Sequence, residues 1–431
     1  MRYTLRDVTA LLRTPVGRRR FVTGASYYGW PVLAWPAALY RRTIARKTRV
    51  IAVTGSFGKT TTTRAIWTVL NGRPAPPRLT PNYKGFLALE LLRIRPGQRH
   101  LVLEVGLSRL NQMADYARVI RPDIAVVTCI GTEHHRSFRT FEVTRSEKSH
   151  LVRVLPPSGT AVLNGDDPNV RWMSGQTRAR VVTFGFDEMS DVRASELALD
   201  WPRGTRFRLA TRAGTREVRV RLLGRPMVYP ILAAVAVALE QGLDLDQAIA
   251  ALETLDPTPA RLQPVPLANG AIIVRDEFKS AQDTIEVALD VLEQIPAKRR
   301  IVVLGDITEP LGSQGPLYRH IGERVARVAT RAFFIGDGAV KYMAGANRSG
   351  LARDAMTRVR TVGILLDMLR HDLGPGDVVL IKGREKQRLD RISLALAGRH
   401  VQCELKWCNA KVRCETCPML ERGWGSERAV T

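Results

Sequence analysis

The chain has 431 residues, of which 45% are hydrophobic and 25% are charged, and its formal net charge is +25. This length predicts two or three domains with sizeable cores, and the ordinary composition excludes a repeat or low-complexity architecture. The charge predicts affinity for polyanions: nucleotides, nucleic acid or an anionic membrane surface. Because the basic residues are scattered and largely arginine, as in proteins from GC-rich genomes, specific nucleic-acid binding is not expected.

The N-terminal segment, residues 1–48, contains an uncharged stretch at residues 21–40 between Arg18–Arg20 and Arg41–Arg42. Its length approaches that of a membrane-spanning helix, with tyrosine and tryptophan near both ends. Two prolines and two glycines argue against a stable span. We therefore expect a packed segment, with a peripheral contact to an anionic membrane as the alternative. Since no signal peptide is visible, we expect a cytoplasmic protein, held at the inner face of the membrane under that alternative.

Buried strands and helices alternate over residues 49–262, which predicts a central domain with a parallel sheet covered by helices. The expected strands are residues 49–53, 100–106, 123–129 and 159–164, and the expected helices are residues 59–70, 86–92, 141–154, 229–240 and 245–255. Residues 179–223 are expected to append antiparallel strands to this sheet.

The proline-rich residues 256–270 predict a linker, after which the alternation restarts. The expected strands of this second part are residues 271–277, 300–306, 331–337 and 377–383. They predict a smaller Rossmann-like domain over residues 263–400. The fold class is therefore α/β, a P-loop ATPase domain followed by a smaller α/β domain.

The stretch IAVTGSFGKTTTTRAIWTVL, residues 51–70, leads from a buried strand into a helix through a glycine-bracketed turn. A helix start carries unpaired N–H groups and the positive end of the helix dipole, so it attracts phosphate. Gly55 and Gly58 let the backbone curl around that phosphate, and Lys59 can reach its terminal oxygens. The alternative is an ordinary threonine-capped helix start, because Val53 occupies the place of the first glycine in the general P-loop pattern.

Polar residues follow the next strands at the same edge of the expected sheet. Glu104 ends one strand, where open α/β sheets bind ligands, and beside the Thr60 hydroxyl it is placed to hold Mg²⁺. His134 and His135 follow another strand, and Lys148 lies on the helix after them. Their spacing alone does not distinguish these residues from surface side chains. Near the linker, Arg261 and Asp276 offer a cation for phosphate and an acceptor for a ribose hydroxyl.

These segments resemble the Mur ligases, the ATP-dependent amide ligases of peptidoglycan precursor synthesis, and most of all their D-alanyl-D-alanine-adding (MurF) type. The resemblance covers roughly residues 49–400. It rests on TGSFGKTTT at 54–62, LEVG at 103–106, the spacing from His134 to Lys148, LNGDDPNV at 163–170, ARL at 260–262, VLGDITEPLG at 303–312 and IKG at 381–383. The P-loop without its first glycine is this family's own form.

The resemblance implies an ADP-forming reaction in which ATP phosphorylates a substrate carboxylate and an amine then displaces the phosphate to form an amide. It implies that ATP is bound by Gly55, Ser56, Phe57, Gly58, Lys59, Thr60 and Thr61, and by Arg261 and Asp276 when the C-terminal domain closes. It implies that Thr60 and Glu104 hold one Mg²⁺ and that His134 is a ligand of a second. Lys148 would become a carbamate that ligates Mg²⁺, and the partners would be amino-acid or peptide substrates and a cell-wall-precursor-like carboxylate. It indicates no oligomeric state.

The chain departs from the family pattern near the nucleotide and acceptor sites. Thr128 replaces an asparagine six residues before the metal histidine, Pro226-Met227 replace a His-Asn pair, and DEFKSAQ at 276–282 keeps only the aspartate of its motif. Fewer than fifty residues precede the P-loop strand, so the family's UDP-binding domain is expected to be absent or reduced. Two alternatives follow: a MurT-like amidating subunit acting on a lipid-linked precursor, and a nucleotide- or nucleic-acid-binding protein without ligase activity.

The C-terminal tail, residues 401–431, lies outside this resemblance and holds four of the five cysteines. Cys403, Cys408, Cys414 and Cys417 have the spacing C-x4-C-x5-C-x2-C. Four thiolates within so short a stretch match a closed tetrahedral Zn²⁺ site. We therefore expect a structural zinc site, with two disulfides, a redox pair or unrelated cysteines as the alternatives.

Overall fold

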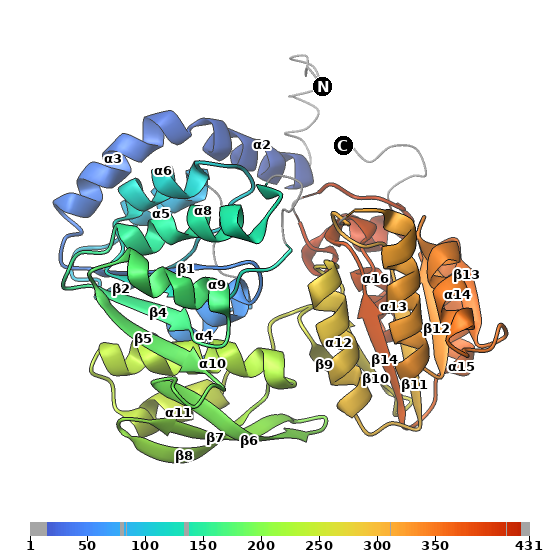
Figure 1. Cartoon of the computed structure of the whole chain (residues 1–431). Helices are drawn as coiled ribbons and strands as arrows, with labels where there is room; N and C mark the ends of the chain where they lie inside the picture. The colour runs from blue at the N-terminus through green and yellow to red at the C-terminus, as the bar shows by residue number, and fades with distance from the viewer. Residues whose placement is uncertain are drawn as a thin grey trace, which may run out of the picture. The chain divides into compact units, whose positions relative to one another are not determined.

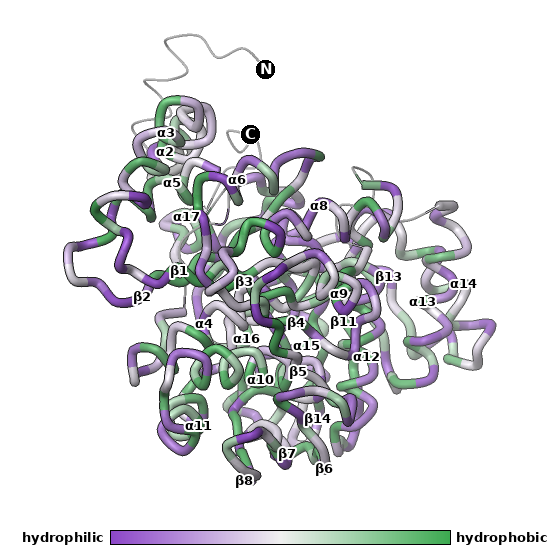
Figure 2. The backbone as a smooth tube through the Cα atoms, turned by 60° about the vertical axis from the view of Figure 1, so that its left-hand side comes forward, coloured by the Kyte–Doolittle hydropathy of each residue, from purple (hydrophilic) through white to green (hydrophobic). Residues whose placement is uncertain are grey.

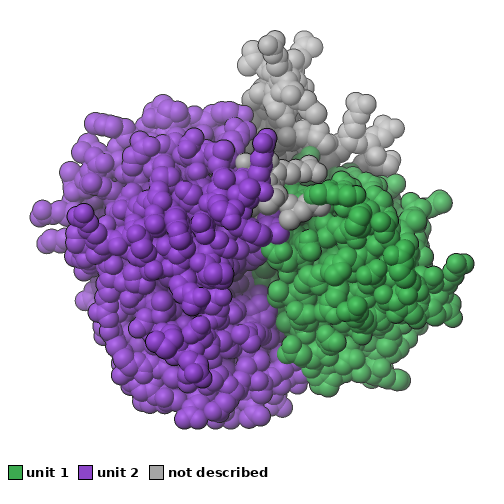
Figure 3. Space-filling view, viewed as in Figure 1, with its two compact units in different colours: residues 1–24, 259–431 green, residues 25–258 purple. Residues whose placement is uncertain are grey.

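The computed structural model describes residues 15–77, 82, 84–132, 138–310, 312–410 and 412–423. It divides into two compact units, coloured separately in Figure 3. The first unit is Ala25–Thr258, and the second is Pro259–Thr431 together with Met1–Gly24.

The first unit is built on an eight-stranded sheet with the strand order β2-β1-β3-β4-β5-β6-β7-β8. The strands from β2 to β6 pair in parallel, and β7 and β8 extend the sheet antiparallel. Their bounds are Arg49–Thr54 (β1), His100–Glu104 (β2), Ile124–Val127 (β3), Thr160–Asn164 (β4), Arg180–Gly185 (β5), Val192–Asp200 (β6), Gly204–Thr211 (β7) and Gly214–Val220 (β8). The predicted α/β fold with a central parallel sheet is confirmed.

Helices cover both faces of this sheet (Figure 1). Because side chains alternate along a strand, β1 sends Ile51 and Val53 into one core and Val50 and Ala52 into the other. The helices are α4 (Lys59–Asn71), α5 (Lys84–Leu92), α6 (Gln112–Ile120), α8 (Phe141–Arg153), α9 (Pro168–Arg171), α10 (Arg225–Glu240) and α11 (Leu245–Glu253). The hydropathy of the buried strands and of α10 can be followed along the backbone in Figure 2.

The prediction of antiparallel strands over residues 179–223 is wrong for the start of that stretch. β5 pairs parallel to β4. The crossover connection that a parallel pair requires is formed by α9 and a 3-10 turn at Trp172–Gln176. β6 pairs parallel to β5 and antiparallel to β7. β6 was not predicted, because most of its residues are only half-buried and the apolar alternation of Val192 and Ala194 stops at Glu196, where the pairing with β7 shifts register.

Between residue 15 and β1 the chain forms two helices, α2 (Pro15–Tyr28) and α3 (Trp30–Arg42). α3 packs on α5 and α6, and the buried Arg41 fixes its C-terminal end by donating to Asp123 at 2.7 Å. Within the described parts of the chain, no helix is long and apolar enough to cross a membrane.

The second unit contains a six-stranded sheet with the order β13-β12-β11-β14-β10-β9, parallel except for the edge strand β9. Its elements are β9 (Gln263–Pro266), β10 (Ile272–Asp276), α12 (Gln282–Gln294), β11 (Arg299–Leu304), α13 (Gln314–Val328), β12 (Arg331–Ile335), α14 (Ala339–Arg348), β13 (Met356–Val359), α15 (Val362–Asp372), β14 (Asp377–Lys382), α16 (Asp390–Leu396) and α17 (Met419–Arg422). The proline-rich stretch predicted as a linker therefore contains β9, whose prolines suit an edge strand. The short strand β13 was also missed.

Candidate functional site

The turn between β1 and α4 has the backbone shape of a phosphate-binding loop. Gly55 has a φ of 144° and Gly58 a φ of 82°, conformations that residues with side chains rarely adopt. A Cβ at Gly55 would lie 1.9 Å from the Thr128 hydroxyl oxygen, so this position has no room for a side chain. Gly58 directly precedes the first turn of α4, whose positive end faces the loop.

The segment that follows β3 supports the loop through hydrogen bonds. The Thr128 hydroxyl donates to the carbonyl oxygen of Phe57 at 2.5 Å, and the Ser56 N–H donates to the Cys129 carbonyl at 2.8 Å. The Ser56 hydroxyl accepts the Gly131 N–H at 2.9 Å. Thr128 stands where the family has asparagine, and the structure gives it this supporting contact, which the sequence analysis did not anticipate.

Lys59 lies over the loop rather than in solvent. Its side chain is buried, and its ammonium donates to the carbonyl oxygens of Gly55 and Ser56 at 2.7 and 3.0 Å. The amine therefore lies at the opening of the loop, where it would contact the terminal phosphate of a bound nucleotide.

Thr60 and Glu104 meet because Glu104 ends β2, while Thr60 lies in the first turn of α4, directly after the loop that follows the neighbouring parallel strand β1. The Thr60 hydroxyl donates to Glu104 Oε2 at 2.8 Å, and Asn82 Nδ2 donates to Oε1 at 2.6 Å. A hydroxyl and a carboxylate form an oxygen donor set of the kind that Mg²⁺ prefers. Thr61, by contrast, is buried and pairs with the Thr258 hydroxyl at 3.0 Å.

Lys148 reaches the same loop from α8. It is 3% exposed, and its amine donates to the Gly55 carbonyl oxygen at 3.1 Å. Burial lowers the pKa of Lys148 well below its ordinary value, and the nearby Lys59 ammonium lowers it further. The structure thus brings Lys148 to the P-loop as a buried amine biased toward its neutral form. His134 and His135 lie outside the described residues.

The LNGDDPNV motif, residues 163–170, forms hydrogen bonds with the loops at this edge of the sheet. Asn164 donates to the Thr128 carbonyl at 2.7 Å. Asp167 caps α9 and accepts the Ile130 N–H at 2.7 Å. Both contacts reach back to the segment that supports the P-loop, a role that the sequence analysis did not assign to either residue.

Asp166 of the same motif connects to the start of α10, where Pro226 and Met227 depart from the family pattern. Its carboxylate accepts the Phe186 N–H and the Tyr229 hydroxyl, each at 2.8 Å. The Arg225 guanidinium stacks 4.0 Å from the centroid of the Phe186 ring. Proline fits this place because the first helical turn needs no N–H from it.

In the second unit, Asp276 is buried at the end of β10 and is already paired. Lys382 of the IKG motif donates to one of its oxygens at 2.5 Å, and the Leu262 N–H donates to the other at 3.3 Å. Burial raises the pKa of Asp276 and lowers that of Lys382, and the attraction within the pair offsets part of both shifts. The sequence analysis named Asp276 but missed Lys382 as its partner.

Arg261 lies against Phe278, with its guanidinium 4.3 Å from the ring centroid. Arg413 of the tail approaches the same ring at 4.8 Å and donates to the Pro259 carbonyl at 3.1 Å. This contact joins the tail to the segment that follows β10, within the second unit.

The structure gives no support to the predicted zinc site. Within the described ranges, no three histidine, cysteine or acidic residues lie close enough together to hold a metal ion. The tail is instead bound by arginines of α16 and the preceding turn. Arg391 is 1% exposed and donates to the carbonyl oxygens of Cys403 and Leu405, and Arg388 donates to that of Ala410.

Two family models match the chain: the Mur ligase middle domain at residues 53–238 and the Mur ligase, glutamate ligase domain at residues 260–385. Together they cover well over half of its length. The chain belongs to the Mur ligase family.

Curated relatives of this Mur ligase include two types of ligase. The UDP-N-acetylmuramoyl-tripeptide–D-alanyl-D-alanine ligase of Mycobacterium bovis is 32% identical, over 84% of this chain and 75% of its own. The enzyme of the same name from Bacillus subtilis is 26% identical, over 80% and 75%. The UDP-N-acetylmuramoyl-L-alanyl-D-glutamate–2,6-diaminopimelate ligase of Geobacillus kaustophilus is 27% identical, over 88% and 79%.

Solved structures share the fold of this Mur ligase. MurF from Acinetobacter baumannii superposes with a TM-score of 0.75 at 24% identity, over 86% of this chain and 81% of its own. MurF from Thermotoga maritima, in complex with ADP, gives a TM-score of 0.73 at 23% identity, over 85% and 83%. The prediction of an ATP-dependent ligase of this family is confirmed, and the amidating and non-enzymatic alternatives are not favoured.

Proposed function

We propose that the chain catalyses the ADP-forming ligation of a carboxylate on a cell-wall-precursor-like donor to the amine of an amino acid or dipeptide. The names of its relatives support this class of substrates, because two of those named above join D-alanyl-D-alanine to a UDP-N-acetylmuramoyl-tripeptide. In the reaction, a donor carboxylate oxygen attacks the γ-phosphorus of ATP and ADP leaves. The amine then attacks the acyl carbon, loses a proton and expels phosphate.

The observation that carries this proposal is the convergence of Lys59, Lys148, Thr60 and Glu104 at one edge of the sheet. Lys59 and the N–H groups at the start of α4 are placed to neutralise charge on the transferring phosphoryl group, which is the main requirement of phosphoryl transfer. A nucleotide-binding module without catalysis needs no second buried lysine at its P-loop.

Thr60 and Glu104 fit the proposed Mg²⁺ through their oxygen donors. Mg²⁺ in such sites takes one or two carboxylates, water and substrate phosphate rather than a cage of protein ligands. It would supply charge neutralisation at the β- and γ-phosphates. His134 remains the proposed ligand of a second ion.

Lys148 is proposed to carry a carbamate. Only a neutral amine adds to CO₂, forming an N–C bond and releasing one proton, and burial beside Lys59 favours that neutral form. The product is an anion where Lys148 now places an amine, 3.1 Å from the Gly55 carbonyl oxygen. Such an anion would offset the positive charge of Lys59.

ADP release by the purified chain tests the proposal. The donors would be UDP-N-acetylmuramoyl-tripeptide, a lipid-linked precursor and a free peptide, each with D-alanyl-D-alanine or single amino acids. We expect ADP release that requires both a donor and an amine, with phosphate released in equal amount. Release that needs neither substrate would contradict a ligase.

A matched pair of variants separates catalysis from folding. Lys59→Met should lower turnover by about 1,000-fold or more, because the transition state loses a fixed positive charge. Lys298→Met removes an exposed lysine of the second unit and should leave turnover unchanged. Near-normal turnover of Lys59→Met would refute the assignment.

A further inference from the structure

Helix α3 forms an extra layer on the first unit, outside α5 and α6 (Figure 1). Its inward side packs into the core through Trp30, Leu33 and the fully buried Ala37. The Trp30 and Tyr116 rings meet edge to face, with centroids 5.3 Å apart. The helix is therefore docked along one side, and its other side has no protein layer over it within the described part of this unit.

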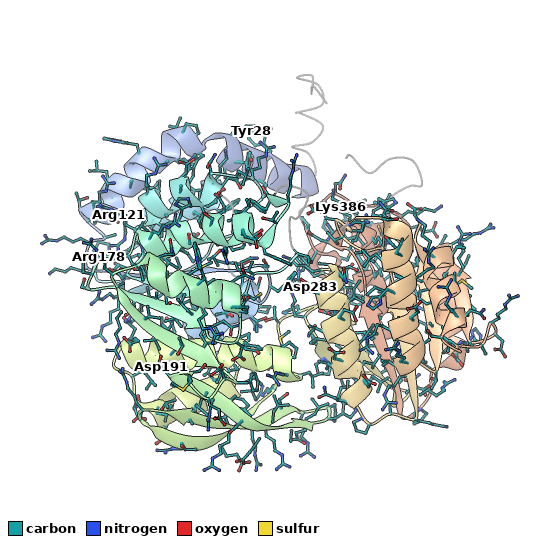
Figure 4. All side chains as sticks on the ribbon, in the orientation of Figure 1. Tyr28, Arg121, Arg178, Asp191, Asp283 and Lys386 are labelled. Carbon is teal, nitrogen blue, oxygen red and sulfur yellow. The ribbon has the colours of Figure 1, made fainter. Side chains whose placement is uncertain are left out.

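That outer side is apolar. Tyr28, Val32, Trp35 and Leu39 are 82%, 76%, 72% and 46% exposed. Val32, Trp35 and Leu39, spaced three and four residues apart, lie in one stripe along the axis of α3, and Tyr28, the last residue of α2, lies four residues before Val32. We call these four residues the α3 stripe; Tyr28, at its start, is labelled in Figure 4.

A helix that is apolar on both sides needs an apolar environment for the second side. Residues 30–40 carry no charge at all, yet no described helix is long and apolar enough to span a bilayer. Tyrosine and tryptophan are the residue types that prefer the boundary between headgroups and acyl chains. The stripe therefore suits a helix that lies in a membrane surface.

The charged residues around the α3 stripe indicate which kind of membrane surface it fits. The sequence has no acidic residue between Asp7 and Glu90, and the exposed Arg42, Arg46 and Lys47 follow the stripe directly. Arg41 is excluded from this basic group because it is buried and bound to Asp123. Basic residues beside a shallow apolar helix bind anionic headgroups.

We propose that α3 docks this ligase peripherally on an anionic lipid bilayer, with the α3 stripe among the upper acyl chains and the basic group of Arg42, Arg46 and Lys47 at the headgroups. A second copy of the chain is a poorer occupant. A two-fold contact through this face would bring two basic groups together on chains of net charge +25, and the sequence offers no acidic residue between Asp7 and Glu90 to pair with them.

Sedimentation with sucrose-loaded vesicles tests the proposal on the full chain. We expect the wild type to sediment with phosphatidylcholine vesicles in which about one third of the lipid is phosphatidylglycerol, and far less with pure phosphatidylcholine. Binding should weaken as salt is added, since screening reduces the attraction of the basic group.

Two sets of substitutions separate the apolar from the electrostatic part. Val32→Ser, Trp35→Ser and Leu39→Ser together should weaken partitioning by about tenfold or more. Arg42→Gln, Arg46→Gln and Lys47→Gln together should weaken it on the order of 100-fold at low salt and hardly at high salt.

The matched control is Met189→Ser with Arg206→Gln. Met189 is 89% exposed, and Arg206 is exposed on β7, on the opposite side of this unit from α3 in Figure 1. The control should bind like the wild type. Because all these side chains are exposed, circular dichroism and thermal melting should show every variant folded.

Tryptophan fluorescence provides a second measurement, which reports on helix α3 itself. Quenching of tryptophan fluorescence by brominated anionic vesicles should fall in a Trp35→Phe variant. Equal sedimentation with both vesicle types, or unchanged binding by the stripe variant, would overturn the proposal. Self-association that the stripe substitutions abolish, without vesicle binding, would overturn it in favour of a second copy.

Discussion

The amines of Lys59 and Lys148 donate to the same acceptor, the carbonyl oxygen of Gly55, from two different helices. Both side chains are buried, so two positive charges at this place would repel each other in a poorly screened environment. Burial, and next the nearby Lys59, lower the pKa of Lys148, which favours the neutral form of this second amine.

Lys148→Met should stabilise the protein near neutral pH, in buffer free of CO₂. The pKa of Lys148 is lowered on folding, so between its folded and unfolded pKa the unfolded chain binds the extra proton. The lysine therefore costs stability at low and neutral pH, and that cost falls by about 1.4 kcal/mol per pH unit as pH rises toward the unfolded pKa. Urea unfolding of both proteins from pH 7 to 10 measures the difference. A gap that stays constant with pH would contradict it.

Lys148→Ala should be inactive and partly restored by short carboxylic acids. The truncation opens space beside the P-loop, where a small carboxylate can take the place of the proposed carbamate anion. ADP release with and without added formate, acetate or propionate measures the rescue. Lys59→Ala is the control, since it should show no rescue by an anion. Full activity of Lys148→Ala without any additive would show that the carbamate is not needed.

Thr128→Val should weaken ATP binding more than it weakens folding. The change keeps the side-chain shape but removes the hydroxyl that donates to the Phe57 carbonyl. The part-buried Phe57 carbonyl then keeps the weak Cys129 thiol donor at 3.6 Å, so the loss is up to about 1–3 kcal/mol within the loop proposed to hold phosphate. The KM for ATP should therefore rise about tenfold or more. Thr330→Val is the control, because it removes an exposed threonine hydroxyl that donates to the Arg300 carbonyl, outside the P-loop and its supporting segment. An unchanged KM would show that Thr128 does not support the loop.

The local part of the site was predictable from the sequence, because its geometry follows from strand, turn and helix. Gly55 and Gly58 indicate the loop in the sequence. Thr60 and Glu104 lie together because the neighbouring parallel strands β1 and β2 end at the same edge of the sheet. Lys148 needed the family resemblance, since a helical lysine at that spacing is ordinarily exposed.

Long-range pairs and weakly patterned strands were not predictable. Lys382 contacts Asp276, which lies 106 residues away in the sequence, and no local sequence pattern predicts this contact. β13 has only four residues and no apolar alternation, and the alternation at the start of β6 stops at Glu196. The four cysteines are a different case: their spacing suggests a common ligand, which the described residues do not show, and Arg388 and Arg391 bind the tail.

Asp276→Ala should destabilise the second unit as well as lower activity. It leaves the Lys382 ammonium buried without a partner, a change that typically costs about 3–5 kcal/mol. The double variant Asp276→Leu, Lys382→Met removes both charges and should recover most of that stability. Urea unfolding measures the stability and ADP release the activity. Full activity of the stabilised double variant would show that the pair is structural and that Asp276 does not contact the nucleotide.

The tail offers the last prediction, because the buried Arg391 is one of the arginines that attach it. Arg391→Met should release residues 401–423 from α16, since it leaves the carbonyl oxygens of Cys403 and Leu405 without their donor, at about 1–3 kcal/mol each. Limited proteolysis should then cut the tail faster than in the wild type. Arg399→Met is the control: Arg399 also binds the tail, through Glu421 at 2.9 Å, but this exposed ion pair is worth only about 0–1 kcal/mol. A chelator that releases the tail of the wild type, while Arg391→Met leaves it protected, would contradict this account and restore the zinc hypothesis.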